Sequence, residues 1–104
     1  MYAVILSSSL NDWVEERSGD ALIDFTLVCR AQMLGSSPPQ STATTVLSAE
    51  LSYDCALIKL CEANGIDVTT LDFSHPDHER DRLESGLLAI GIDLVALSET
   101  QREG

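Results

Sequence analysis

The stretch 44–65, TTVLSAELSYDCALIKLCEANG, constrains the fold of this chain more than any other. Its apolar residues recur with the period of an α-helix for about five turns, so it predicts a long helix. These residues cover a broad arc of the helix, and the narrow polar face holds Ser48, Ser52, Lys59 and Glu62. An arc this broad needs more than one neighbour. We therefore predict that this helix lies between other elements of the core.

The end of this helix is marked by Asn64, Gly65 and Ile66. Glycine readily adopts the left-handed backbone conformation that stops a helix, and Ile66 is placed to fold back as the apolar contact of a Schellman motif. We therefore predict that the helix stops at Gly65.

A second stretch, 21–34, has few polar positions and is followed by Gly35. It predicts a helix that is apolar on nearly every side. In a chain of 104 residues such a helix is either central or buries one flank against a second copy of the protein. The segment 35–43, GSSPPQSTA, is rich in serine and contains two prolines, which favours an exposed connector within a single helical domain that spans 1–104.

A third helix is predicted from about residue 75 to 90. Ser74 fits the N-cap, Pro76 suits the first turn, and Gly91 follows the last turn. The predicted helix has an apolar face toward the core, made of Leu83, Leu87 and Ile90. Its acidic face points toward water and is made of Asp77, Asp81 and Glu84.

The amino-terminal residues are ambiguous. Residues 2–6 fit either a strand or the first turns of a helix. The run from Ser9 to Asp12 fits a capping box, so we predict a short helix from about residue 10 to 17. Trp13 would then cover one edge of the core.

The fold class depends on the residues that follow Gly65 and Gly91, the glycines that end two of the predicted helices. Residues 66–73 have the β-branched residues and alternation of a strand, but they also suit a loop pinned to the core, and the pattern Gly-Ile-Asp recurs at Gly91. We predict an all-α fold, a small bundle of three main helices plus a short N-terminal helix. The alternative is an α/β fold with a small parallel sheet.

Two acidic residues interrupt the apolar arc of the long helix. Glu50 and Asp54 are one turn apart and project between its two apolar flanks. An unpaired buried carboxylate costs several kcal/mol, so we predict a structural ion pair with an arginine, with Arg82 as the first choice because it lies beside Leu83. Two alternatives remain open: the two carboxylates line a pocket as metal ligands or general base, or they bind a basic residue of a partner protein.

The best candidate metal cluster is His75, His78 and Glu79. Residues three apart on a helix face the same side, which two imidazoles need in order to share a cation. The spacing matches no zinc-protease motif, and two histidines at a helix start are usually solvated, so we assign no metal. The chain also lacks a phosphate-binding loop, a G-x-S-x-G motif and a dinucleotide fingerprint, so no catalytic residue or cofactor is assigned.

The charge balance limits the class of partner. The chain has 17 acidic and 6 basic residues, a formal net charge of −11, which argues against direct binding to nucleic acid. A negative field attracts basic proteins or divalent cations.

Cysteine usage and hydropathy point to the cytoplasm. Cys29, Cys55 and Cys61 lie in apolar helical patterns and are odd in number, which favours buried reduced thiols. No apolar run approaches the roughly 18 residues of a membrane span, and the first ten residues lack the basic region of a signal peptide.

The half from Leu51 to Leu94 resembles a type of small helical protein of uncharacterised activity from actinobacteria. The resemblance rests on an aromatic residue followed by Asp54, an apolar helix that ends in Gly-Ile-Asp, and a proline-led helix with Glu79-Arg80 and Arg82-Leu83-Glu84. It implies a helical hairpin and no functional residue.

These observations favour a non-catalytic cytoplasmic adaptor or regulatory protein that acts through an acidic surface on a protein partner, and that forms a homodimer. The competing hypothesis is a small metal-binding protein or enzyme that uses Glu50, Asp54, His75 and His78.

Overall fold

The computed structural model describes residues 2–13, 19–35 and 42–97 of the chain. The described residues form five helical elements and contain no strand. These are α1 (Tyr2–Asn11), α2 (Gly19–Gly35), α3 (Ala43–Ala63), the 3-10 helix η1 (Thr70–Ser74) and α4 (Pro76–Ala89). The all-α prediction is therefore confirmed, and the alternative with a parallel sheet is wrong. Of the predicted connector at 35–43, residues 36–41 lie outside the described residues, while Gly35 ends α2 and Ala43 begins α3.

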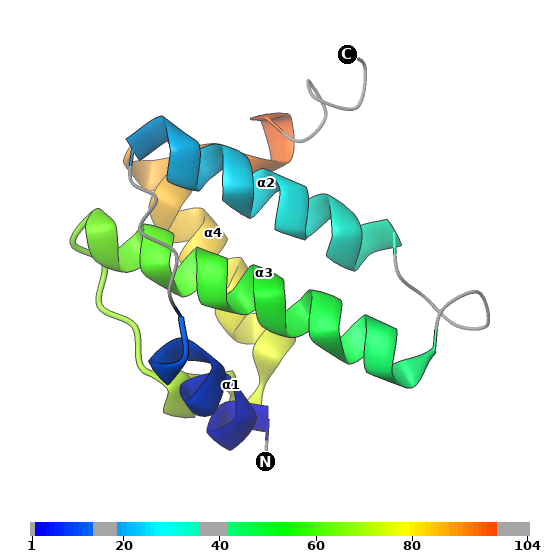
Figure 1. The fold of residues 1–104 in the computed structure, drawn as a ribbon. Helices are drawn as coiled ribbons and strands as arrows, with labels where there is room; N and C mark the ends of the chain where they lie inside the picture. The colour runs from blue at the N-terminus through cyan, green and yellow to red at the C-terminus, as the bar shows by residue number, and fades with distance from the viewer. Residues whose placement is uncertain (1, 14–18, 36–41, 98–104) are drawn as a thin grey trace.

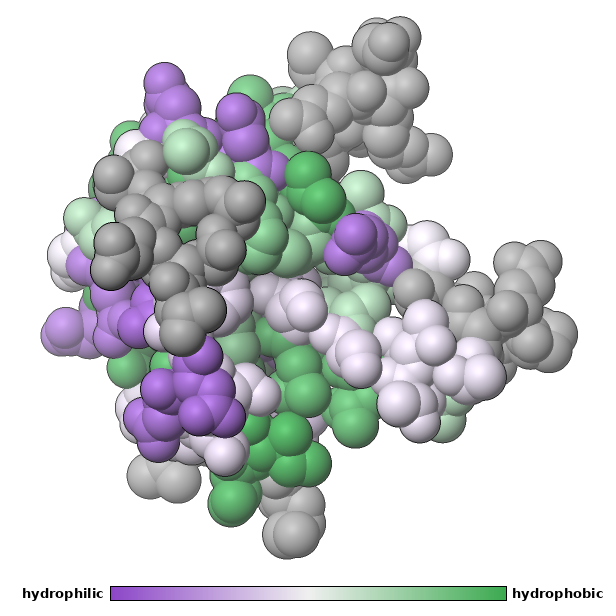
Figure 2. All heavy atoms as spheres, viewed as in Figure 1, coloured by the Kyte–Doolittle hydropathy of each residue, from purple (hydrophilic) through white to green (hydrophobic). Residues whose placement is uncertain are grey.

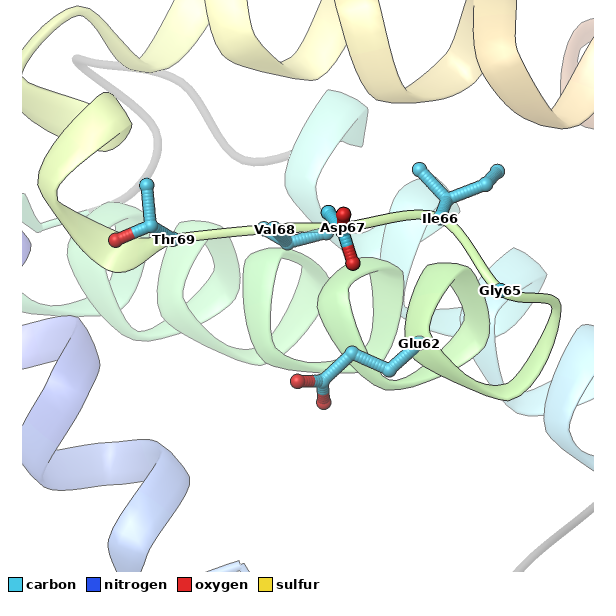
Figure 3. Close-up of a pocket in the computed structure, with 6 residues that line it drawn as sticks. All are labelled: Glu62, Gly65, Ile66, Asp67, Val68 and Thr69. Atoms are coloured by element: carbon cyan, nitrogen blue, oxygen red, sulfur yellow. The ribbon is translucent and has the colours of Figure 1, made fainter.

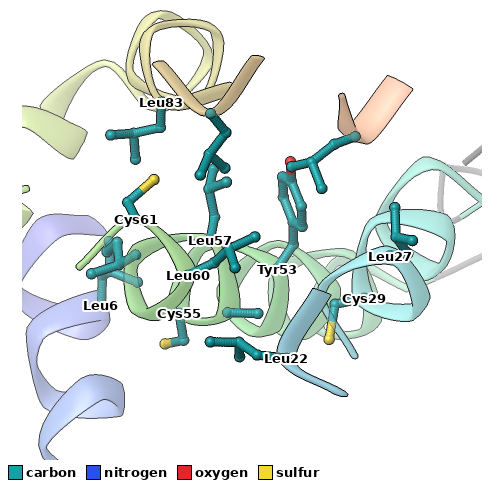
Figure 4. Close-up of a cluster of buried hydrophobic side chains, with 14 of the residues drawn as sticks. Leu6, Leu22, Leu27, Cys29, Tyr53, Cys55, Leu57, Leu60, Cys61 and Leu83 are labelled. Atoms are coloured by element: carbon teal, nitrogen blue, oxygen red, sulfur yellow. The ribbon is translucent and has the colours of Figure 1, made fainter. Parts of the chain in front are cut away.

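Helix α3 is the centre of the bundle, as its broad apolar arc predicts. It packs against α1, α2 and α4, and α2 and α3 form an antiparallel hairpin (Figure 1). Eight of its residues are buried, all of them between Tyr53 and Cys61. Leu83 of α4 lies on one side of α3 and Leu22 of α2 on the other (Figure 4).

Both ends of α3 are closed by local hydrogen bonds. The Thr42 hydroxyl accepts a hydrogen bond from the backbone N–H of Thr45, which satisfies a free donor of the first turn. At the other end, Gly65 has φ of +79°, and the N–H of Ile66 donates to the carbonyl of Cys61 at 2.9 Å. This is the predicted Schellman motif.

Helix α2 lies on the outside of the bundle rather than at its centre. One flank packs on α3, and Thr26 fits there because its hydroxyl donates to the carbonyl of Leu22 at 2.7 Å. On the opposite flank Val28 is 50% exposed, and Leu34, near the end of the helix, is 59% exposed. A bundle this small supplies α2 with only one long neighbour.

The amino-terminal prediction is wrong in its position. The helix occupies Tyr2–Asn11, so Ser9 lies inside it and does not cap a helix over 10–17. Residues 14–17 of that predicted helix lie outside the described residues. Leu6 is completely buried, and α1 packs against η1, where the hydroxyls of Ser7 and Thr70 are 3.3 Å apart. Tertiary contacts thus favour the earlier helix. Trp13 is half-buried and meets Phe25 edge to face, as a cover for the core.

The segment before α4 is loop and 3-10 helix rather than strand. Phe73 of η1 is fully buried and pins it to the core. The N-cap of α4 is His75, which forms no side-chain cap, and Pro76 occupies the first turn, so the prediction of Ser74 as N-cap is wrong.

The two predicted faces of α4 are partly wrong. Leu83 and Leu87 are fully buried, but Ile90 is 51% exposed because it lies past the last turn. Glu84 faces the protein and not water, and it accepts a hydrogen bond from Tyr53. Leu94 adds one more buried side chain after Gly91.

Candidate functional site

The polar centre of the fold is the carboxylate of Asp54, which has no exposed surface. Arg80 donates to it from two nitrogens: Nε to Oδ1 and Nη2 to Oδ2, each at 2.7 Å. Tyr2 of α1 donates its hydroxyl to Oδ2. Three elements far apart in sequence therefore meet at one carboxylate, and the two-pronged geometry is the one that arginine forms best with carboxylates.

Two other acids surround the Arg80 guanidinium. Asp77 Oδ1 lies 3.3 Å from Nη1, and Glu50 Oε2 lies 4.0 Å from Nη2. The Asp77 side chain is 95% exposed and that of Glu50 is 35% exposed. Both therefore contribute far less than Asp54, because water screens exposed charges.

The prediction of Arg82 as the partner of Asp54 is wrong. Arg82 forms an ion pair with Glu79 three residues earlier on the same helix, with Nη2 2.6 Å from Oε2. The reason is the phase of α4. Arg80, Leu83 and Leu87 share one face at spacings of three and four residues, whereas Arg82 lies about 200° around the helix from Arg80.

A second, partly buried group of a tyrosine, an arginine and a carboxylate lies on the adjacent side of α3. Tyr53 donates its hydroxyl to Glu84 of α4, and Nε of Arg30 from α2 lies 3.6 Å from the same carboxylate. This group was not predicted from the sequence. It links α2, α3 and α4 as the Asp54 group links α1, α3 and α4.

The two tyrosines and Arg80 in these groups have shifted pKa values. Burial raises the pKa of Tyr2 and of Tyr53 above the ordinary value, and the hydrogen bonds to Asp54 and Glu84 raise each further. Burial lowers the pKa of Arg80, but its hydrogen bonds with Asp54 outweigh burial and raise it. All three side chains therefore hold their protons at neutral pH, and the groups act as fixed structural links.

The candidate metal ligands are not brought together around a common point. The rings of His75 and His78 are exposed, with centroids 6.0 Å apart, while Glu79 is buried and paired with Arg82. Within the described part of the chain, no three His, Cys, Asp or Glu side chains are grouped to hold a metal ion.

Four exposed acids lie on the segments that meet where α2 begins and α3 ends. Hydrophilic residues lie along that edge in Figure 2, and the hairpin places the first turns of α2 beside the last turn of α3 (Figure 1). We call Asp20, Asp24, Glu62 and Asp67 the acidic end. All four are exposed, and none forms an ion pair with a described residue.

A shallow hollow of about 540 Å³ lies within the acidic end. It is lined by the end of α3 and the loop after it, namely Glu62, Gly65, Ile66, Asp67, Val68 and Thr69 (Figure 3). A second hollow, of about 400 Å³, lies between α2 and α3, and four of its six lining residues are serine or threonine. Neither contains Glu50, Asp54, His75 or His78.

The three cysteines are buried, and they form no disulfide with one another. Burial raises the pKa of Cys55 to about 11 and that of Cys61 to about 12. Neither thiol is suited to act as a nucleophile at neutral pH, because the thiolate is the reactive form.

Among the described residues, no helix combines the length and the hydropathy that a membrane crossing requires. Comparison of the chain with known protein families, with curated proteins and with solved structures finds no significant match.

Proposed function

We propose that this chain is a non-catalytic adaptor or regulatory protein of the cytoplasm, and that its acidic end binds a basic segment of a protein partner. One observation carries the proposal: the carboxylates inside the fold are engaged by arginines, whereas those of the acidic end have no ion-pair partner among the described residues. The interior pairs are Arg80 with Asp54, Arg30 with Glu84, and Arg82 with Glu79.

This division of charge has a physical consequence. Each interior pair is neutral, so the formal net charge of −11 is carried by the remaining residues. An uncompensated acidic surface speeds the approach of a basic partner and selects against acidic ones.

The experiment is fluorescence anisotropy with labelled ten-residue peptides of basic, neutral and acidic composition. The basic peptide should bind, and its affinity should fall between about 0.01 M and about 0.15 M salt, where the screening length shrinks from about 30 Å to about 8 Å. Equal affinity for all three peptides, or no change with salt, would contradict the proposal.

The competing hypothesis of a metal-binding protein or enzyme receives less support from the geometry. Asp54 is fully buried and accepts hydrogen bonds from Arg80 and Tyr2, so its carboxylate cannot reach a substrate. Measuring the melting temperature with and without added zinc distinguishes the two functions, because a ligand that binds only the native state raises its stability. A stoichiometric rise in melting temperature that His78→Ala removes would favour the metal-binding function.

We also propose that the chain forms a homodimer through the outer flank of α2. Val28 is exposed on this flank, and Leu34 is exposed beside it near the end of α2. Of the described helices, only α3 packs against α2. Light scattering should give twice the 11.3 kDa of one chain, and Val28→Glu should halve that mass. A wild-type monomer at high micromolar concentration would refute the dimer.

A further inference from the structure

The loop at 66–69 offers an unused backbone edge inside the acidic end. The chain runs nearly straight along α3 from Ile66 to Thr69 (Figure 3). Ile66 and Val68 are half-buried, while Asp67 and Thr69 are exposed. This alternation is the pattern of an extended backbone, in which successive side chains point to opposite sides.

The backbone donors of this loop are not used by the fold. The N–H of Ile66 bonds to Cys61, but the N–H groups of Asp67, Val68 and Thr69 form no hydrogen bond with any described residue. In an extended segment every second N–H points to the same edge, and N–H groups on an edge that lacks a neighbouring strand can pair with the carbonyls of another extended chain.

The loop is held in place at both ends. The side chain of Ile66 points toward α4 in Figure 3, and its Cδ1 would lie 3.5 Å from a Cβ placed on Gly86. At the other end, the Thr70 hydroxyl is 3.3 Å from that of Ser7. A partner would therefore meet an edge that is already ordered, which lowers the entropic cost of binding.

The charge beside this edge selects the partner. The hollow along the loop contains two carboxylates, Glu62 and Asp67, and no basic side chain. Both carboxylates are exposed and have no described ion-pair partner. A lysine or arginine placed in the hollow would form an ion pair with these carboxylates without breaking an ion pair between described residues.

We propose that an extended, basic segment of a partner protein docks alongside 66–69 by strand addition, with its cationic side chains on Glu62 and Asp67. Four residues of strand span about 13 Å, so the edge accommodates about four residues of the partner. A helical segment does not fit this role, because its own hydrogen bonds use its backbone groups. This inference rests on the proposed function and names the site for it.

The probe is an alternating lysine–valine hexapeptide, blocked at both ends, titrated into ¹⁵N-labelled protein. We expect amide shifts at 65–69 and an affinity that Glu62→Gln/Asp67→Asn lowers about tenfold. The matched control, Asp20→Asn/Asp24→Asn, removes the same charge from the same end and should lower the affinity less than about threefold. Circular dichroism should show that both variants keep the fold.

A second peptide with a modified backbone tests whether binding uses backbone hydrogen bonds. The same hexapeptide N-methylated at every internal residue keeps its charge, but the methyl groups on both backbone edges prevent either edge from lying against the loop, and it should bind at least about tenfold more weakly. Equal binding of the two peptides, or shifts confined to residues away from the loop, would overturn strand addition and leave the proposed function standing. No binding of this or any other basic peptide would overturn both.

Discussion

Arg80 binds Asp54 through two nitrogens, each 2.7 Å from a different carboxylate oxygen, and joins α4 to α3 inside the protein. Tyr2 donates to the same carboxylate, so this one group also holds α1. The pair is buried and its polar atoms are satisfied, which makes it a link that specifies how three helices meet rather than a surface on which chemistry could occur.

The Asp54 pair should be worth far more to stability than the Glu50 contact. Asp54→Ala leaves a buried guanidinium without its main partner, and breaking such a pair costs about 3 to 5 kcal/mol. Glu50→Ala should cost less than about 1 kcal/mol, because its carboxylate is part-exposed and 4.0 Å from Arg80. Urea unfolding measures both values. A cost below about 1 kcal/mol for Asp54→Ala would mean that this carboxylate is not a structural link.

Stability should fall at alkaline pH because of the buried tyrosines. The pKa of Tyr2 and of Tyr53 is raised by burial, whereas in the unfolded chain each ionises near pH 10. Above about pH 10 the folded state therefore binds more protons than the unfolded state, and the free energy of unfolding falls as pH rises. Below that pH the contribution is constant.

Urea midpoints measured from pH 8 to pH 11.5 would show this fall. The thiols of Cys55 and Cys61 act in the same direction from about pH 9, because their pKa values are also raised. The comparison is therefore between wild type and Tyr2→Phe/Tyr53→Phe, which should lose stability less steeply above pH 10. Parallel curves for the two proteins would contradict the assignment to tyrosine.

The thiols of Cys55 and Cys61 should be inert in the native state. Their side chains are 2% and 0% exposed, and their raised pKa values leave almost no thiolate at neutral pH. A thiol-specific reagent at about pH 7.5 should react at least about a hundredfold faster in denaturing urea than in buffer. Rapid reaction of the native protein would show that these thiols are accessible.

Local patterns predicted the centre of the fold well. The broad arc of α3 and the stop at Gly65 depend on residues within a few turns of each other, so sequence alone contains the information. The burial of Asp54 and its pairing with an arginine also follow from position on the α3 arc. To identify which arginine pairs with Asp54, one must know which face of α4 points to the core. The i, i+3, i+7 spacing of Arg80, Leu83 and Leu87 indicates that face.

Other features depend on contacts between distant segments. Residues 2–11 form a helix that packs on η1 and covers Asp54 with Tyr2, and no local capping signal indicates that. The loop at 66–69 carries strand-like residues but lies beside no other strand in the described chain, so it stays a single extended segment. Its open edge could be recognised only after the fold was known.

The most direct test of the account is the affinity for a basic peptide after the acidic end is neutralised by Asp20→Asn/Asp24→Asn/Glu62→Gln/Asp67→Asn. The control is Asp77→Asn/Asp81→Asn, which removes exposed charges from the start of α4. At about 0.01 M salt the four-residue variant should keep its helical fold and lose most of the affinity, while the control keeps most of it. Unchanged affinity in the four-residue variant would contradict the claim that this protein acts through its acidic end.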